Sequence, residues 1–182
     1  MDKPLRPSPP QGTVIWLTGL PGSGKTAIAQ EIEGELRERG HQVEVLDGDF
    51  IRKNLSPELG FSKEDRETHN KRVIFISKLL SRNGVVVIVP LISPYRAVRD
   101  YARKEVTNFV EIYVKCAIEE CIRRDPKGLY KKALRGEIKD MTGIQDPYEE
   151  PLNPELVVNT DCETLEQSAG RVLQRVKELG YL

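Results

Sequence analysis

The sequence predicts an α/β fold in three layers, with a five-stranded parallel sheet between two layers of helices. Three observations predict it. Short apolar runs alternate with longer segments of helical period, as expected for strands that are buried on both faces. A glycine-rich loop directly follows the first apolar run. The length of 182 residues suits one domain, which we place at 13–182, behind a flexible, proline-rich leader at 1–12.

The expected strands are the short apolar runs. They lie at residues 14–18 (VIWLT), 43–46 (VEVL), 85–89 (VVVIV), 109–115 (FVEIYVK) and 156–159 (LVVN). The run at 85–89 contains only Val and Ile, so we expect it inside the sheet. Right-handed crossovers through the intervening helices keep such strands parallel.

Helical spacing is clearest in three segments. Residues 25–39 carry Ile or Leu at every fourth position, and a second helix is expected to begin after Ser62, with a capping-box-like S-x-x-D, and to end near Gly84. In the last helix, Thr164 and Gln167 can form a capping box. Its apolar stripe consists of Leu165, Ala169, Val172, Val176 and Leu179.

Composition excludes several classes of protein. Lys plus Arg and Asp plus Glu both number 28, and this balance argues against nucleic acid as the main partner. The longest apolar run, residues 85–92, is far shorter than the roughly 20 residues that cross a bilayer, so we expect no membrane partner. The chain starts without a signal-like apolar segment. Its three cysteines, Cys116, Cys121 and Cys162, suit reduced thiols, and we therefore expect a cytoplasmic protein.

The glycine-rich loop matches the phosphate-binding pattern G-x-x-x-x-G-K-[ST], between a predicted strand and a predicted helix. Its residues are Gly19, Leu20, Pro21, Gly22, Ser23, Gly24, Lys25 and Thr26. Backbone N–H groups of such a P-loop, with the positive end of the helix dipole, surround a phosphate. Lys25 is expected to reach the outer phosphates, and the Thr26 hydroxyl to hold Mg²⁺. A chance glycine-rich turn is the alternative.

Two acids follow the second predicted strand, in the segment LDGD at 46–49. Ligands of open α/β sheets bind beyond the carboxyl ends of the strands. There Asp47 and Asp49 could position Mg²⁺ or accept a proton from an attacking hydroxyl. An Asp-Gly turn with solvated acids is the alternative. A GTPase is disfavoured because the sequence has no N-K-x-D motif.

The segment at approximately 127–151 has no sustained period and is rich in Gly and Lys. Irregular connections of this length are uncommon in compact domains and often serve as lids. We therefore predict a mobile lid that closes over the triphosphate and excludes water. The cations that suit this role are Lys127, Lys131, Lys132 and Arg135, whereas Lys139 is expected to be merely solvated.

Several further motifs occur in a characteristic order. They are LDGD-x-x-R at 46–52, LGFS-x-E-D-R at 59–66, Asn70, ISPYR at 92–96, RDPKGLYKKA at 124–133 and TGI-x-DPYE-x-P at 142–151. As an ordered set, they resemble the adenylyl-sulfate kinase family over nearly the whole chain from Gly12. The resemblance implies a P-loop NTPase fold. It also implies transfer of the γ-phosphoryl group of ATP to the 3'-hydroxyl of adenosine 5'-phosphosulfate (APS), which gives PAPS and ADP in sulfate assimilation.

The resemblance also implies catalytic roles. Asp49 serves as base or as organiser of Mg²⁺, with Asp47 in support and Lys25 at the phosphates; the metal contacts are Thr26 and Asp49. A weak base suffices because the transition state of phosphoryl transfer is loose. Some family members carry a phosphoserine at the position of Ser93. We expect direct transfer instead, with a main-chain contact from Ser93, because no base lies beside it in the sequence.

For the substrates, the resemblance implies that Arg52, Arg66 and Asn70 bind the oxyanions of APS, which suit guanidinium groups. Phe61 is expected to stack on the APS adenine, with Met141, where the family usually has Phe, on its other side. The remaining implied contacts are Ile92, Ser93 and Lys127 for APS, and Arg124 and Lys127 for ATP. The alternatives are a solvated helix face for the arginines and a core anchor for Phe61.

Two other functions stay open at this level. One is a P-loop kinase for another small acceptor, such as a nucleoside, shikimate or gluconate. The other is a regulatory module that binds ATP without turnover. The family resemblance further suggests a homodimer and functional coupling to ATP sulfurylase.

Overall fold

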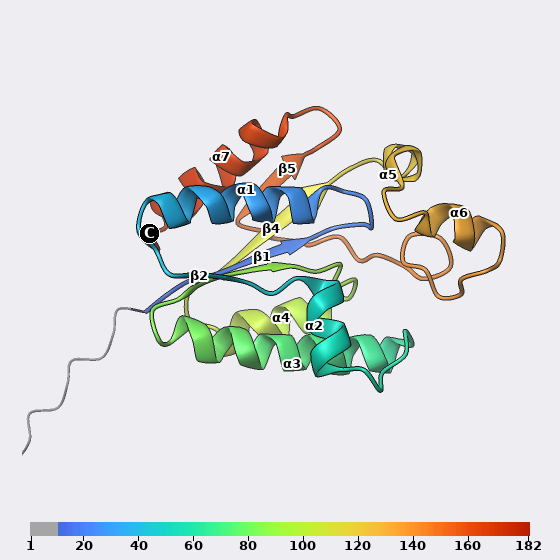
Figure 1. The fold of residues 1–182 in the computed structure, drawn as a ribbon, viewed down its shortest axis with the longest axis horizontal. Helices are drawn as coiled ribbons and strands as arrows, with labels where there is room; N and C mark the ends of the chain where they lie inside the picture. Colours follow the sequence, from blue (N-terminus) through green and yellow to red (C-terminus); the bar gives the residue numbers. More distant parts are fainter. Residues whose placement is uncertain (1–10) are drawn as a thin grey trace, which may run out of the picture.

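The computed structural model describes residues 11–182, so nearly all of the leader expected at 1–12 lies outside the described residues. Five strands form one parallel sheet in the order β2-β3-β1-β4-β5 (Figure 1). They are β1 (Val14–Thr18), β2 (Val43–Val45), β3 (Val86–Pro90), β4 (Phe109–Lys115) and β5 (Leu156–Asn159). The predicted five-stranded parallel sheet is confirmed, and β3 lies inside it as expected.

Helices cover both faces of the sheet, which confirms the three layers. Helices α1 (Lys25–Glu38) and α7 (Leu165–Glu178) lie on one face, and α3 (Lys63–Ser81) and α4 (Arg96–Glu105) lie on the other (Figure 1). Three shorter helices lie nearer the carboxyl ends of the strands: α2 (Gly48–Leu55), α5 (Ile118–Arg124) and α6 (Leu129–Leu134).

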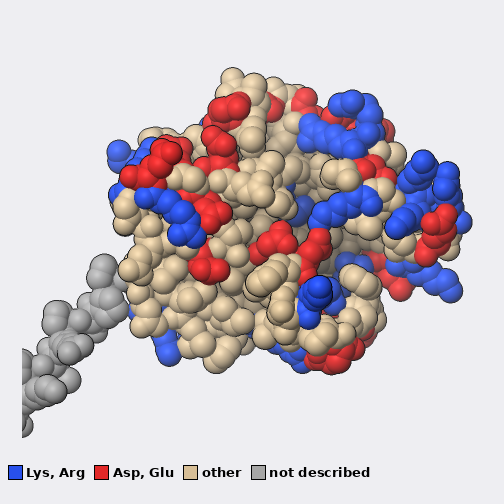
Figure 2. Space-filling model, in the orientation of Figure 1, with Lys and Arg blue, Asp and Glu red and all other residues tan. Residues whose placement is uncertain are grey.

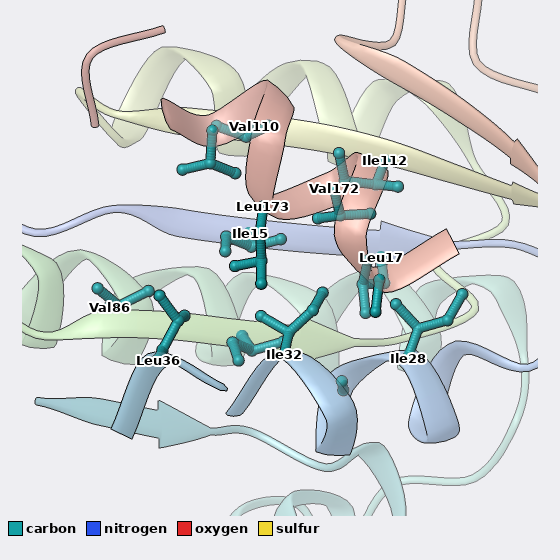
Figure 3. Packing of buried hydrophobic residues seen from close by; sticks show 14 of the residues in the cluster. Ile15, Leu17, Ile28, Ile32, Leu36, Val86, Val110, Ile112, Val172 and Leu173 are labelled. Atoms are coloured by element: carbon teal, nitrogen blue, oxygen red, sulfur yellow. The ribbon is translucent and has the colours of Figure 1, made fainter. Parts of the chain in front are cut away.

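The core follows from the alternation of side chains along each strand. Ile15 and Leu17 of β1 are buried against α1 and α7, and Figure 3 shows Ile32 and Val172 from these helices among them. Trp16, between the two in sequence, is buried on the opposite side with residues of α3 and α4. Both faces of the central strand are therefore sealed, and the sheet is a rigid base for the loops at its carboxyl edge.

Helix caps form where the sequence predicts them. The Ser62 hydroxyl accepts a hydrogen bond from the Asp65 amide at 3.1 Å, and Thr164 and Gln167 form the complete capping box of α7. The predicted stripe of α7 needs one correction. Leu165 remains exposed because it lies in the first turn, beyond the edge of the core, whereas Leu173 is buried.

The sequence analysis missed four helices, namely α2, α4, α5 and α6. Three of them are at most eight residues long, too short for a repeating pattern to be recognised, and α4 (RAVRDYARKE) has few apolar residues because most of its residues are charged. Helix α6 lies within the predicted lid segment, which is therefore partly helical. None of the helices over residues 11–182 combines the length and the apolar composition that a membrane crossing requires.

Candidate active site

The glycine-rich loop joins β1 to α1 at the carboxyl edge of the sheet (Figure 1). Gly24 caps α1 with a φ of 96°, in the left-handed region where a side chain is disfavoured. Gly22 has a φ of 77°. This backbone path leads the chain into α1 with the free N–H groups of its first turn at the loop, where an anion can bind.

Lys25, the first residue of α1, is buried against the loop that precedes it. Its Nζ donates to the carbonyl oxygens of Gly19 at 2.9 Å and Leu20 at 2.7 Å, and to the Ser23 hydroxyl at 3.3 Å. Burial, together with the nearby charge of Lys127, lowers the pKa of Lys25 to about 7. A phosphate beside this amine would favour its charged form again.

The two predicted acids lie at the start of α2. Asp47 is the N-cap: its carboxylate accepts hydrogen bonds from the amides of Asp49 at 3.1 Å and Phe50 at 3.2 Å. Asp49, in the first turn, is exposed and forms an ion pair with Lys127 of the α5–α6 loop. The segment is thus the beginning of a helix and not an isolated turn, with Asp49 exposed to solvent.

A cavity of about 500 Å³ lies at the carboxyl ends of β2 and β3, between α2 and α3. Its lining includes most of the residues predicted for catalysis and acceptor binding: Lys25, Asp47, Asp49, Arg52, Phe61, Arg66, Asn70, Ile92 and Ser93. These residues are far apart in sequence. They meet because parallel strands deliver their following loops to the same edge of the sheet.

Phe61 and two arginines form one wall of this cavity. The Phe61 ring is 58% exposed, so the alternative of a core anchor is wrong. The Cζ atoms of Arg52 and Arg66 lie 4.7 Å and 5.7 Å from the ring centroid. Arg66 is buried and donates to the Phe61 carbonyl at 2.8 Å and to the Thr142 hydroxyl at 3.1 Å, which ties the lid segment to α3.

Ser93 lies in the loop after β3 and has a positive φ of 38°. Its hydroxyl is buried, accepts a hydrogen bond from the Trp16 indole at 2.9 Å and donates to the Thr18 hydroxyl at 3.1 Å. Phosphorylation at this oxygen would remove the hydrogen that it donates to Thr18. The main-chain role of Ser93 stays a prediction.

A second cavity, of about 350 Å³, lies on the other side of the P-loop. Arg124 and Lys127, predicted to contact ATP, line it together with Gly24, Lys25 and Thr26. Arg124 also donates to the Thr160 hydroxyl at 3.3 Å and to Glu120 at 2.8 Å, which fixes its position. Lys25 lines both cavities and so marks the place where they meet.

The sequence profile of the adenylylsulphate kinase family matches residues 11–159. The chain belongs to this family. It is 57% identical to an adenylyl-sulfate kinase from Rippkaea orientalis over 94% of this chain and 95% of that protein. A probable adenylyl-sulfate kinase from Pyrococcus abyssi is 56% identical, over 94% of this chain and 99% of that protein. The resemblance read from the motifs is thereby confirmed.

The solved structures agree with this assignment. The APS kinase of Mycobacterium tuberculosis in complex with AMPPNP and APS aligns with a TM-score of 0.89 and 41% identity, over 93% of this chain and 99% of that one. A shikimate kinase from Acinetobacter baumannii and a gluconokinase from Sinorhizobium meliloti, each 18% identical, share the fold alone. A hexameric APS kinase and a probable bifunctional SAT/APS kinase are also among the relatives.

Two residues predicted to contact APS, Met141 and Lys127, do not line the cavity of about 500 Å³; Lys127 lines the second cavity instead. Met141 is buried in a small cluster in which residues of the segment 127–151, Tyr130 and Ala133, pack against Cys116 and Cys121. A thioether packs well among such side chains, so Met141 belongs to this buried cluster and does not line the cavity.

Two side chains that the sequence analysis missed stand out in the structure. His69 lines the cavity of about 500 Å³; its Nδ1 lies 3.0 Å from the Ser56 hydroxyl, while its buried Nε2 has no partner among the described residues. Arg99 of α4 is buried beside Ser93. Helical spacing could have identified His69, because it lies one turn after Arg66 on the same face of α3.

The oxygen donors at the P-loop suit Mg²⁺. Thr26 offers a hydroxyl, and Asp47 and Asp49 offer carboxylates, the hard ligands that this ion prefers. Among residues 11–182, no group of three or more His, Cys, Asp or Glu side chains could form a complete metal cage.

Proposed function

We propose that this chain transfers the γ-phosphoryl group of ATP to the 3'-hydroxyl of APS, giving PAPS and ADP. One observation carries the proposal: Lys25 lines two cavities, one built on the P-loop and the other lined by carboxylates, guanidinium groups and an exposed aromatic ring. ATP would bind in the first and APS in the second, so that the γ-phosphate meets the acceptor hydroxyl beside Lys25.

In this reaction, the acceptor oxygen forms a bond to the γ-phosphorus while the bond between that phosphorus and the β,γ-bridging oxygen breaks. The acceptor proton passes to the Asp49 carboxylate, which Asp47 supports by capping α2. Lys25 and the P-loop amides stabilise the charge that builds up on the leaving ADP. Thr26 and Asp49 would hold Mg²⁺, which would neutralise part of the same charge.

The acceptor would be held by charge and by stacking. Arg52 and Arg66 suit the sulfate and phosphate oxygens of APS, and Asn70 adds an amide in the same cavity. The exposed Phe61 ring offers a flat face to the adenine. The Ile92–Ser93 main chain borders the same space. We propose one-step transfer, without a phosphoserine at Ser93.

We also propose that residues 127–151 form a mobile lid. Figure 2 shows Lys and Arg side chains gathered at the end of the molecule where α5 and α6 lie. Among them Lys127 already reaches across to Asp49. Closure over the triphosphate would exclude water and limit wasteful hydrolysis. A homodimer, coupling to ATP sulfurylase and a cytoplasmic location stay predictions.

Mass spectrometry of the products tests the function. The purified protein is incubated with ATP, Mg²⁺ and APS, and we expect PAPS and ADP in equal amounts. Parallel reactions contain shikimate, gluconate or a nucleoside in place of APS. Turnover of one of these without turnover of APS would make the chain another small-molecule kinase. ATP binding without turnover of any acceptor would make it a regulatory module.

A further inference from the structure

Arg99 is the most deeply buried guanidinium of the described residues, and the reaction proposed above gives it no role. It lies on α4 and is 2% exposed. Its Nε donates to the Glu111 carboxylate of β4 at 2.8 Å, and that acid is also buried. A buried charge pair is costly to desolvate and is seldom needed for stability alone, so its further contacts are informative.

The two remaining nitrogens of Arg99 reach two segments that are about fifty residues apart in sequence. One donates to the carbonyl oxygen of Ser93, in the loop that borders the acceptor cavity. The other donates to the carbonyl oxygen of Glu149, at the end of the lid segment. The Tyr148 ring also packs on the guanidinium, with its centroid 5.7 Å from Cζ. A single side chain therefore holds both segments.

Hydrogen bonds from β1 hold the same two segments from the opposite side. The Thr18 hydroxyl donates to the Ile92 carbonyl at 2.7 Å and lies 2.9 Å from the Tyr148 hydroxyl. The Glu149 amide donates to the Pro94 carbonyl at 2.9 Å. Ser93, with its positive φ, lies at the centre of this network, where its strained backbone needs support from its surroundings.

We infer that Arg99 is a positioning residue for the acceptor: it fixes the Ile92–Ser93 main chain and the end of the lid, Tyr148–Glu149, in one joint arrangement. This inference rests on the proposed function, because it assigns the acceptor to the cavity that Ser93 lines. A lysine cannot replace the side chain, since three donors in one plane are needed to reach Glu111, Ser93 and Glu149 together.

Steady-state kinetics of Arg99→Lys test the inference. We expect the KM for APS to rise roughly tenfold or more while the KM for ATP stays within about twofold, because the P-loop side is untouched. Arg103→Lys is the matched control: Arg103 pairs with the same Glu111 at 3.1 Å but contacts neither Ser93 nor Glu149, so both constants should stay within about twofold. An unchanged KM for APS, or equal changes for both substrates, overturns the inference.

Hydrogen exchange provides a readout that does not depend on activity. The Glu149 amide donates to the Pro94 carbonyl, and the Arg96 amide donates to the Glu149 carboxylate. Both amides should exchange roughly tenfold faster in Arg99→Lys, and their exchange rates should not change in Arg103→Lys. Parent protein that leaves APS unphosphorylated refutes the proposed function, whereas unchanged exchange in Arg99→Lys refutes the inference. If Arg99→Lys does not fold, Tyr148→Phe takes its place, because this variant loses only the hydrogen bond to Thr18. A rise of about threefold in its KM for APS would support the inference, and an unchanged KM would overturn it.

Discussion

At the scale of single residues, Lys25 is unusual because its buried amine has no negatively charged partner. Its amine is buried, yet its three hydrogen-bond acceptors, two carbonyls and the Ser23 hydroxyl, are uncharged. A buried ammonium without a counter-charge is unfavourable, which is why its pKa falls to about 7. An incoming polyphosphate supplies the missing negative charge. Binding energy and proton binding are therefore linked at this residue.

The linkage predicts that ATP binding takes up protons. At about pH 8, above the pKa of Lys25, the free protein holds this amine mostly neutral, whereas bound phosphate keeps it charged, so close to one proton enters on binding. At about pH 6 the amine is already charged and uptake from it disappears. Calorimetry in buffers of different ionisation enthalpy measures this uptake. Lys25→Met reports the protons taken up by ATP itself. Equal uptake by Lys25→Met and the parent at the higher pH would contradict the assignment.

The proposed role of Asp49 as the base predicts a separate effect, on the rate of phosphoryl transfer. Asp49→Asn should lower kcat by roughly a hundredfold or more, because an amide cannot accept the acceptor proton. Its exposed side chain is not needed for packing, so the fold should be kept. Asp100→Asn, an exposed acid on α4, is the control and should be fully active. A kcat within about threefold of the parent would show that Asp49 is not the base.

At the scale of helices and strands, the elements that can be predicted from the sequence are those whose burial produces a clear apolar pattern. Strands β1 and β4 occupy the predicted residues because both of their faces are covered, and nearly continuous apolar runs follow from that. The edge strand β5 also matches its predicted range, although only Val158 in it is fully buried. Helix α2 escaped prediction because it has only eight residues, and α4 because most of its residues are charged. The P-loop and the acids could be predicted from local motifs. Arg99 could not, because its partners Glu111 and Glu149 come close only through the fold.

The contact between α2 and α3 predicts how stability depends on pH. His69 bonds to Ser56, just after α2, and it lies near Arg52 and Arg72. Burial and these two cations lower its pKa to about 4, from 6.5. Between these values the unfolded chain binds the proton and the folded chain does not, so stability is lost as the pH falls through this window. Denaturant unfolding over that range should show a shallower loss for His69→Gln.

The matched control for this effect is His41→Gln. This half-buried histidine follows α1 and lies far from the α2–α3 contact, so its variant should keep the full acid sensitivity of the parent. If both variants lose stability as steeply as the parent, His69 does not titrate as its surroundings require.

At the scale of the whole molecule, the strand order explains why one edge is functional. All five strands are parallel, so the P-loop after β1, the acids after β2 and Ser93 after β3 reach the same edge, where α5 and α6 project (Figure 1). The two cavities share Lys25, and Lys127 of the lid pairs with Asp49 on the acceptor side. A lid that contacts both cavities should respond most strongly when both are filled.

Limited proteolysis tests this joint response. Trypsin should cleave the free protein at the exposed Lys131, Lys132 and Arg135 of the lid. AMPPNP with APS should slow this cleavage by roughly tenfold, and more than either ligand alone, because closure needs contacts from both cavities. Cleavage at Arg39, at the opposite end of α1, is the internal control and should keep its rate. Protection of both sites to the same degree would indicate general stabilisation, and unchanged cleavage at α6 would show that residues 127–151 do not close over the bound substrates.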